Sequence, residues 1–367
     1  MKVTLFKAFP DPYRKSMVVY ADQLLRNLCA VQLPTEKITS YLPRRIRLAP
    51  RMARSWSQYI GYQLKACFTQ GDINHIVDDS FGHLAYSLDA RKTVVTFHDA
   101  TVFKAANGTI KGEGISKGTL LSLRYSSAAV RNVAAVIAVS EISRQDFLQF
   151  TDCDPKKVHV VHHGIDSSFR VLQDRDVLKV RYGLKGQHML HVGHNLFYMN
   201  IEGVLRVLHH LVFRLGLDVK LLKVGLPFTA VQNELVHGLK LEERIVFLGD
   251  VSTEDLPIIY NCADVLLYPV LNSGFGFPPL EAMACGTPVV CSNRGSLPEI
   301  VGDAALMAGP YDHEKLAIHV ASLLENKLVY ATYREKGLEH VRRYSWEKTA
   351  REVLAIYRNI HETNRRR

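Results

Sequence analysis

The sequence predicts an α/β protein built from two doubly wound parallel sheets, one in each of two domains. Short β-branched runs alternate along the chain with stretches of helical periodicity, which is typical of βαβ units. The chain has 367 residues, about the length of two domains of ordinary size. A polar, weakly periodic stretch at residues 166–187 separates the two series of strands. These observations place the domain boundary near residue 180.

Each domain is expected to contain its own series of strands. In the first domain, residues 1–180, the strand candidates are residues 3–6, 73–77, 93–97, 135–139 and 158–162. In the second domain, residues 181–345, they are residues 189–192, 219–224, 245–248, 265–268 and 288–291. Residues 346–367 form a last helical segment, with an apolar stripe through Trp346, Ala350, Val353, Leu354 and Tyr357. We expect this segment to cross back to the first domain.

Open parallel sheets bind ligands beyond the carboxyl ends of their strands. We therefore expect functional residues on the loops that follow strands, lining a cleft between the two domains.

The composition excludes several classes of protein. With 47% hydrophobic, 22% charged and 9% aromatic residues, the chain lies in the globular range rather than the disordered or collagenous one. No apolar run approaches 18 residues, and the N-terminus lacks the apolar segment of a signal peptide. The six cysteines show no C-x-x-C spacing, so we expect buried free thiols and no metal site. We expect a cytoplasmic protein.

The net charge of +10 is concentrated in the first domain. The densest basic segment carries apolar residues between its arginines, which are Arg44, Arg45, Arg47, Arg51 and Arg54. Such a segment fits a solvated basic surface, an anionic membrane surface or a nucleic acid. Nucleic-acid binding rests on charge alone, because no basic-aromatic module is visible. We take these arginines as the candidate membrane-facing residues, which would place the protein at the inner face of the cell membrane.

A glycine loop leads into a helix after the strand candidate at residues 265–268. Gly274 and Gly276 allow positive φ and a close backbone approach. Pro278 and Pro279 suit the first turn of a helix that would include Glu281 in that turn. The N–H groups and the positive dipole end of such a helix favour an anion such as a pyrophosphate.

The whole segment at 263–312 resembles the donor-binding signature of glycosyltransferase family four. Further landmarks of that family follow in the same order along the chain, at residues 135–144, 158–166, 191–203, 245–251 and 344–347. The resemblance implies a GT-B fold, two facing Rossmann-like domains with an interdomain cleft. It also implies a retaining glycosyltransferase that moves a sugar from a nucleotide-sugar donor to a glycan or lipid-linked acceptor, such as a surface polysaccharide precursor, without a metal or other cofactor.

The resemblance also implies roles for residues of the second domain. Glu281 would hold the nucleotide ribose, and the backbone of Gly276 and Phe277 would bind the donor phosphate or sugar. The donor loop would also include Gly274 and Phe275, and the loop at Gly249 and Val251 would line the pocket for the nucleotide base.

In the first domain, the sequence Thr96-Phe97-His98-Asp99 looks like the family's T-x-H-D turn. Its histidine would lie beside the transferred sugar, so we take His98 and Asp99 as the candidate catalytic residues. His163 would lie near the same cleft or serve as a core residue.

Four departures from the family pattern surround the donor's diphosphate and sugar. Ser273 stands where the family has its first glutamate, and His194 and Met199 stand where it often has an arginine and a lysine. Ser16 and Met17 replace the glycine pair of the first loop. Loss of one well-placed stabilising group costs roughly 3–4 kcal/mol of transition-state stabilisation. Other cations could compensate, and the candidates are Lys7, Arg14, Lys15 and Lys223.

Two hypotheses remain open. The first is an active retaining transferase, in which the leaving phosphate helps to accept the acceptor's proton, so that paired catalytic carboxylates are not required. The second is a catalytically silent relative that keeps the GT-B shell as the binding or scaffold partner of an active transferase. Motifs for a dinucleotide-dependent dehydrogenase or a serine hydrolase do not match the chain.

Overall fold

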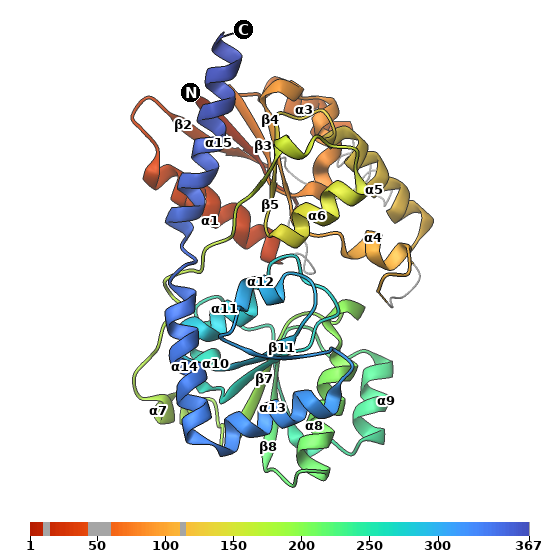
Figure 1. Cartoon of the computed structure of the whole chain (residues 1–367), viewed down its shortest axis with the longest axis vertical. Helices are drawn as coiled ribbons and strands as arrows, with labels where there is room; N and C mark the ends of the chain where they lie inside the picture. The colour runs from red at the N-terminus through yellow and green to blue at the C-terminus, as the bar shows by residue number, and fades with distance from the viewer. Residues whose placement is uncertain (10–14, 43–59, 111–114, 367) are drawn as a thin grey trace. The chain divides into compact units, whose positions relative to one another are not determined.

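The computed structural model of the protein describes residues 1–9, 15–42, 60–110 and 115–366. The chain divides into two compact units. The first unit contains Met1–Gly164 together with Tyr344–Arg367, and the second contains Ile165–Arg343. In each unit, helices flank both faces of one parallel sheet (Figure 1).

The first unit contains a sheet in the order β2-β1-β3-β4-β5-β6, with every neighbouring pair parallel. Its strands are β1 (Lys2–Phe6), β2 (Lys37–Tyr41), β3 (Ile73–Ile76), β4 (Thr93–Phe97), β5 (Ala135–Ala138) and β6 (Val158–Val160). Its helices are α1 (Lys15–Val31), α3 (Tyr62–Phe68), α4 (Thr101–Ala106), α5 (Lys117–Val130), α6 (Glu141–Phe150) and α15 (Trp346–Arg366). All residues of β3, β4 and β5 are buried, as expected for strands covered on both faces.

The second unit contains a sheet in the order β12-β11-β10-β7-β8-β9, also parallel throughout. Its strands are β7 (Gln187–Val192), β8 (Val219–Val224), β9 (Ile245–Gly249), β10 (Val265–Tyr268), β11 (Val289–Ser292) and β12 (Leu306–Ala308). Its helices are α7 (Arg175–Arg181), α8 (Ile201–Phe213), α9 (Ala230–Gly238), α10 (Leu256–Cys262), α11 (Phe277–Ala284), α12 (Leu297–Val301), α13 (His313–Glu325) and α14 (Lys327–Val341).

The division between the units falls at Gly164, earlier than the predicted boundary near residue 180. The stretch predicted as a connection contains α7, which is fixed to the second unit by polar contacts. Leu172 N–H donates to Asn261 Oδ1 at 2.8 Å, and the Arg175 guanidinium reaches Asp264 at 2.7 Å. Part of the polar composition that suggested a linker therefore belongs to side chains that dock α7, since Lys179 also pairs with Asp264 at 3.1 Å.

Helix α15 belongs to the first unit, where it packs along α1 (Figure 1). The apolar stripe of this helix is buried through Trp346, Val353 and Tyr357. A side chain at Gly164 would collide with the backbone of Trp346, so the close approach of α15 requires glycine there.

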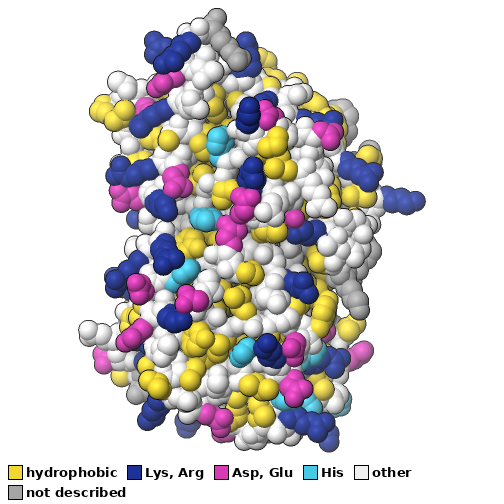
Figure 2. Space-filling model, viewed as in Figure 1, with side chains coloured by type: hydrophobic (Ala, Val, Ile, Leu, Met, Phe, Trp, Pro, Cys, Tyr) yellow, Lys and Arg dark blue, Asp and Glu magenta, His cyan; other side chains and the backbone are white. Residues whose placement is uncertain are grey.

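Charged side chains of both signs are interspersed on the face seen in Figure 2. Within the described ranges, no helix is long and apolar enough to cross a membrane. The six cysteines are free, but Cys29 and Cys67 are exposed, which corrects the expectation that all the thiols are buried. Cys29 and Cys67 lie near the ends of α1 and α3, where the apolar pattern of the sequence does not predict whether a side chain is exposed.

Candidate functional site

The loop after β10 leads into α11 through Gly276, which has a φ of +100°. Pro278 and Pro279 have no N–H, so the backbone donors at the start of this helix belong to Gly276 and Phe277. A side chain at Gly276 would approach Leu297 of α12 to 2.8 Å, so both the conformation and the space favour glycine.

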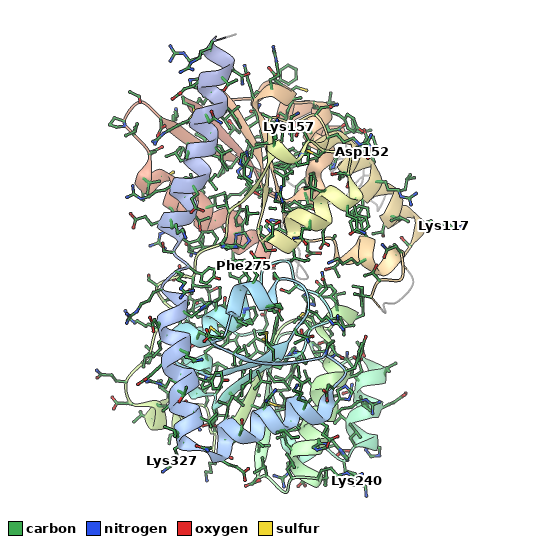
Figure 3. The ribbon with its side chains drawn as sticks, viewed as in Figure 1. Lys117, Asp152, Lys157, Lys240, Phe275 and Lys327 are labelled. Atoms are coloured by element: carbon green, nitrogen blue, oxygen red, sulfur yellow. The ribbon has the colours of Figure 1, made fainter. Side chains whose placement is uncertain are left out.

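This donor loop is fixed from behind by the segment that follows β11. Ser296 N–H donates to the Ser273 carbonyl at 3.0 Å, and the Ser296 hydroxyl donates to the Phe275 carbonyl at 2.8 Å. Phe275, labelled in Figure 3, thus lies beside α12 at one end of the second unit. The sequence analysis did not single out Ser296, although the glycine before it, Gly295, marks the same turn.

Glu281 lies in the second turn of α11 rather than the first, because the helix begins at Phe277. Its Oε2 accepts a hydrogen bond from the Tyr260 hydroxyl at 2.7 Å. Burial raises the pKa of Glu281 to about 7, despite this hydrogen bond. In its ionised form Glu281 accepts hydroxyl donors, and Tyr260 is a partner that the sequence analysis missed.

The loops that follow β7, β8 and β9 meet through three glycines with positive φ. Gly193 N–H donates to the Val224 carbonyl at 3.2 Å, and Gly225 N–H donates to the Gly249 carbonyl at 2.8 Å. A side chain at Gly225 would collide with the Gly193 carbonyl. Val251, two residues beyond Gly249, is half-buried. The structure therefore places the predicted base-pocket residues and the loop that follows β7, the Gly193 loop, together at the carboxyl edge of one sheet.

His194 and Met199 occupy the loop after β7. Leu196 N–H donates to His194 Nδ1 at 3.3 Å, so in the neutral ring the proton is on Nε2. The Tyr198 hydroxyl lies 3.0 Å from Nε2. Met199 is buried, with its terminal methyl group against Gly193. Leu271 N–H donates to the Tyr198 carbonyl at 2.7 Å, which joins this loop to the donor loop.

In the first unit, His98 follows β4 in a closely held turn. Its Nε2 donates to the Val77 carbonyl at 2.9 Å, and its backbone N–H donates to Asp79 at 3.1 Å. Asp99 accepts from Thr101 N–H at 2.7 Å, which fixes the start of α4. Both residues are therefore positioned before any ligand binds.

A buried polar network lies beneath this turn. The Tyr20 hydroxyl and His75 Nε2 lie 2.8 Å and 2.7 Å from Thr96 Oγ1, and the Tyr357 hydroxyl lies 2.5 Å from His75 Nδ1. Burial lowers the pKa of His75 to about 3, so the network is neutral at physiological pH. The Tyr20 ring meets the His98 ring edge to face at 5.0 Å.

His163 is also buried, with its ring stacked on Trp346 at 5.8 Å. Burial, with a smaller effect of His98, lowers the pKa of His163 well below its ordinary value. Ser16 and Met17 form the first turn of α1, where Ser16 is exposed and Met17 half-buried.

The remaining predicted residues divide into three groups. Arg14 and the arginines at 44, 45, 47, 51 and 54 lie outside the described residues, as does the side chain of Lys15. Lys7 forms an ion pair with Asp22 at 2.5 Å within the first unit. Lys223 lies within the second unit beside Gly193, with its Nζ donating to the Gly193 carbonyl at 2.9 Å. No cluster of metal-ligating side chains occurs in the part of the chain that is described.

Two family models cover most of the chain. Residues 3–169 match Glycosyltransferase Family 4, and residues 177–340 match Glycosyl transferases group 1. The chain belongs to glycosyltransferase family 4. It is a glycosyltransferase with two sheets of the GT-B class, as the sequence predicted.

Curated relatives of this glycosyltransferase include O-antigen chain mannosyltransferase B of Escherichia coli, which is 29% identical over 276 residues. That match covers 73% of this chain and 70% of the relative. The D-inositol 3-phosphate glycosyltransferase of Mycobacterium sp. strain KMS is 30% identical over 287 residues, covering 75% of this chain and 64% of the relative. The chain also matches the serotype-specific mannosyltransferase WbdA of Escherichia coli, of which it spans only 28%.

Solved structures share the fold of this glycosyltransferase at low sequence identity. Sucrose-phosphate synthase from Thermosynechococcus elongatus superimposes with a TM-score of 0.82 at 19% identity, covering 99% of both chains. Anabaena HepE in complex with UDP-glucose superimposes with a TM-score of 0.73 at 18% identity, covering 100% of both.

Proposed function

We propose that this glycosyltransferase moves mannose from a nucleoside diphosphate donor, held by the second unit, to a glycan or lipid-linked acceptor of surface polysaccharide synthesis. The observation that carries the donor site is the donor loop itself. It places the backbone donors of Gly276 and Phe277 and the carboxyl group of Glu281 within the first two turns of α11. The choice of sugar and pathway is supported by the names of the mannosyltransferase relatives.

The transfer is proposed to retain the anomeric configuration. The bond between the anomeric carbon and the diphosphate oxygen breaks, and the bond to the acceptor oxygen forms on the same face of the sugar. The acceptor's proton passes to the leaving diphosphate, so this chemistry needs no carboxylate nucleophile in the chain. The demand on the protein is electrostatic, since it must stabilise negative charge on the leaving diphosphate.

A transfer assay tests the proposal. The purified protein is incubated with mannosylated nucleoside diphosphates and mannose-containing oligosaccharide or lipid-linked acceptors, and the product linkage is read by NMR. The proposal predicts a mannosylated product with the donor's anomeric configuration. Transfer of another sugar would overturn the mannose assignment, and an inverted product would overturn retention.

A second candidate function is a catalytically silent scaffold for an active transferase. It is favoured by Met199 and Ser273, which offer neither the cation nor the carboxylate of the family pattern. The double variant Met199→Lys with Ser273→Glu separates the two functions. New activity in the variant, with none in the wild type, would favour the silent scaffold, whereas activity in the wild type would exclude it.

A further inference from the structure

Strand β8 contains a fully buried lysine. Lys223 is 0% exposed, and its register partner on β7 is His191. Its Nζ donates to the carbonyls of Gly193 at 2.9 Å, Val224 at 3.0 Å and Leu226 at 3.4 Å. These carbonyls belong to the ends of β7 and β8 and the loops that follow them, so the ammonium group lies beneath both loops.

No carboxylate pairs with this ammonium group among the described residues. Three carbonyl oxygens satisfy its hydrogen bonds but do not neutralise its charge. Burial lowers the pKa of Lys223 to about 8, so most molecules still carry the charge at neutral pH. Burying an ion without a counter-charge is unfavourable. An anionic ligand would offset part of that cost.

The Gly193 loop is also where the family's diphosphate cations are missing. Met199 fills the space against Gly193 with a methyl group, and His194 is engaged by Tyr198. Beside Lys223, His191 donates from Nδ1 to the Leu267 carbonyl at 3.2 Å, and its buried Nε2 has no hydrogen-bond partner within the described chain. Burial lowers the pKa of His191 to about 3, so this ring adds no charge. Lys223 therefore provides a buried positive charge next to the Gly193 loop.

We propose that Lys223 supplies, from beneath the Gly193 loop, the positive charge that attracts the diphosphate of the donor, in place of the arginine and lysine that the family often has at positions 194 and 199. This inference rests on the proposed donor site. Lys223 acts across the loop as a positioning residue, because its Nζ already bonds three carbonyls. The buried surroundings have a low dielectric constant, so they screen the charge of Lys223 only weakly. The three carbonyl oxygens that accept hydrogen bonds from Nζ carry partial negative charge, and these hydrogen bonds reduce their repulsion of an anionic ligand.

Comparing ligands with and without the diphosphate separates this role from a structural one. Lys223→Met removes the charge while keeping the length of the side chain, and Lys220→Met on the same strand is the matched control. Affinities for a nucleoside diphosphate and for the corresponding nucleoside are measured by calorimetry and NMR. We expect the diphosphate to bind Lys223→Met about 10–100-fold more weakly. The nucleoside should bind as it does to the wild type, and Lys220→Met should bind both ligands normally.

A rescue variant sharpens the test. Adding Met199→Lys to Lys223→Met should recover much of the diphosphate affinity, because it returns a cation to the same subsite. If Lys223→Met does not fold, Lys223→Gln keeps donors for the carbonyls and removes only the charge.

The outcomes are distinct. If Lys223→Met lost affinity equally for the nucleoside and the nucleoside diphosphate, or kept its diphosphate affinity unchanged, the role of Lys223 would be overturned. The proposed donor site would still stand. A wild-type protein that binds no nucleoside diphosphate would overturn the donor site and this inference together.

Discussion

A buried polar network of the first unit and a buried lysine of the second unit differ in how their polar groups are satisfied. In the first unit, Tyr20, Thr96, His75 and Tyr357 satisfy one another as a neutral chain of hydrogen bonds. In the second unit, Lys223 remains charged and meets only backbone carbonyls, beside a His191 nitrogen without a partner. A satisfied neutral network stabilises a single arrangement, whereas an uncompensated buried charge is stabilised further by a ligand of opposite sign.

The network of the first unit also includes a residue of the last helix. Tyr357 belongs to α15, so its hydroxyl joins the C-terminal segment to β3, while the ring is buried against the sheet. We expect Tyr357→Ala to lower the free energy of unfolding by about 3–5 kcal/mol, since it removes a buried aromatic ring and a hydrogen bond. Chemical denaturation measures the effect.

Tyr311, which is 54% exposed, is the matched control for that substitution. Tyr311→Ala should change the unfolding free energy by less than about 0.5 kcal/mol. Equal effects of the two substitutions would show that burial in the network is not what holds α15.

The close contact of the glycine loops in the second unit can be broken with one methyl group. Gly225→Ala places a Cβ into the Gly193 carbonyl at a residue with a φ of +112°. We expect a loss of about 1–3 kcal/mol in stability and a weaker affinity for the nucleotide. Gly238→Ala is the control, because a Cβ there meets open space. Unchanged stability in Gly225→Ala would show that the loops can separate at little cost.

The buried neutral histidines predict how stability depends on pH. The pKa values of His75 and His191 are both lowered to about 3 by burial, against an ordinary value of 6.5. Between those values the unfolded chain binds more protons, so their contribution is complete above pH 6.5 and is lost as pH falls toward 3. Each histidine contributes a slope of at most about 1.4 kcal/mol per pH unit.

Urea unfolding at pH 7, 6 and 5 measures this slope. His75→Gln should reduce it, and the exposed His237→Gln should not. A slope that His75→Gln leaves unchanged would contradict the assignment of the effect to the buried network.

The smallest expected effect concerns an ion pair between α15 and the segment before β2. Arg358 forms two hydrogen bonds with the Glu36 carboxylate, at 2.8 Å and 3.0 Å. The Arg358 side chain is 38% exposed, so we expect Glu36→Gln to cost only about 1 kcal/mol. Arg351→Gln, in an exposed pair with Glu347, should cost less. The reverse order would show that the pair does not help to hold α15.

The sequence predicted the two-sheet fold because most strands are buried, β-branched and separated by helical periodicity. It missed β2 and β12, each of which is one of the two edge strands of its sheet. Ile38 is the one buried residue of β2, and β12 has only three residues, so neither produces a strong periodic signal. The division into compact units at Gly164 precedes the predicted boundary near residue 180, because Arg175 and Lys179 of α7 make tertiary contacts with Asp264 that composition does not reveal.

The candidate site was predicted where a residue type carries its own chemistry, as for Glu281 and the glycines of the donor loop. The partners of those residues could not be predicted from spacing. Tyr260 and Ser296 are brought to Glu281 and Phe275 only by the fold. Lys223 was one of four candidate cations for replacing the missing diphosphate ligands. The structure distinguishes these cations by placing Lys7 against Asp22 and Lys223 beneath the Gly193 loop.

The most direct test of the central claim is a calorimetric titration of the wild-type protein with a panel of nucleoside diphosphate sugars. The account predicts micromolar binding of one donor, lost in Glu281→Ala and retained in Glu335→Ala, an exposed glutamate of α14. A folded wild-type protein that binds none of the panel would contradict a working donor site in the second unit.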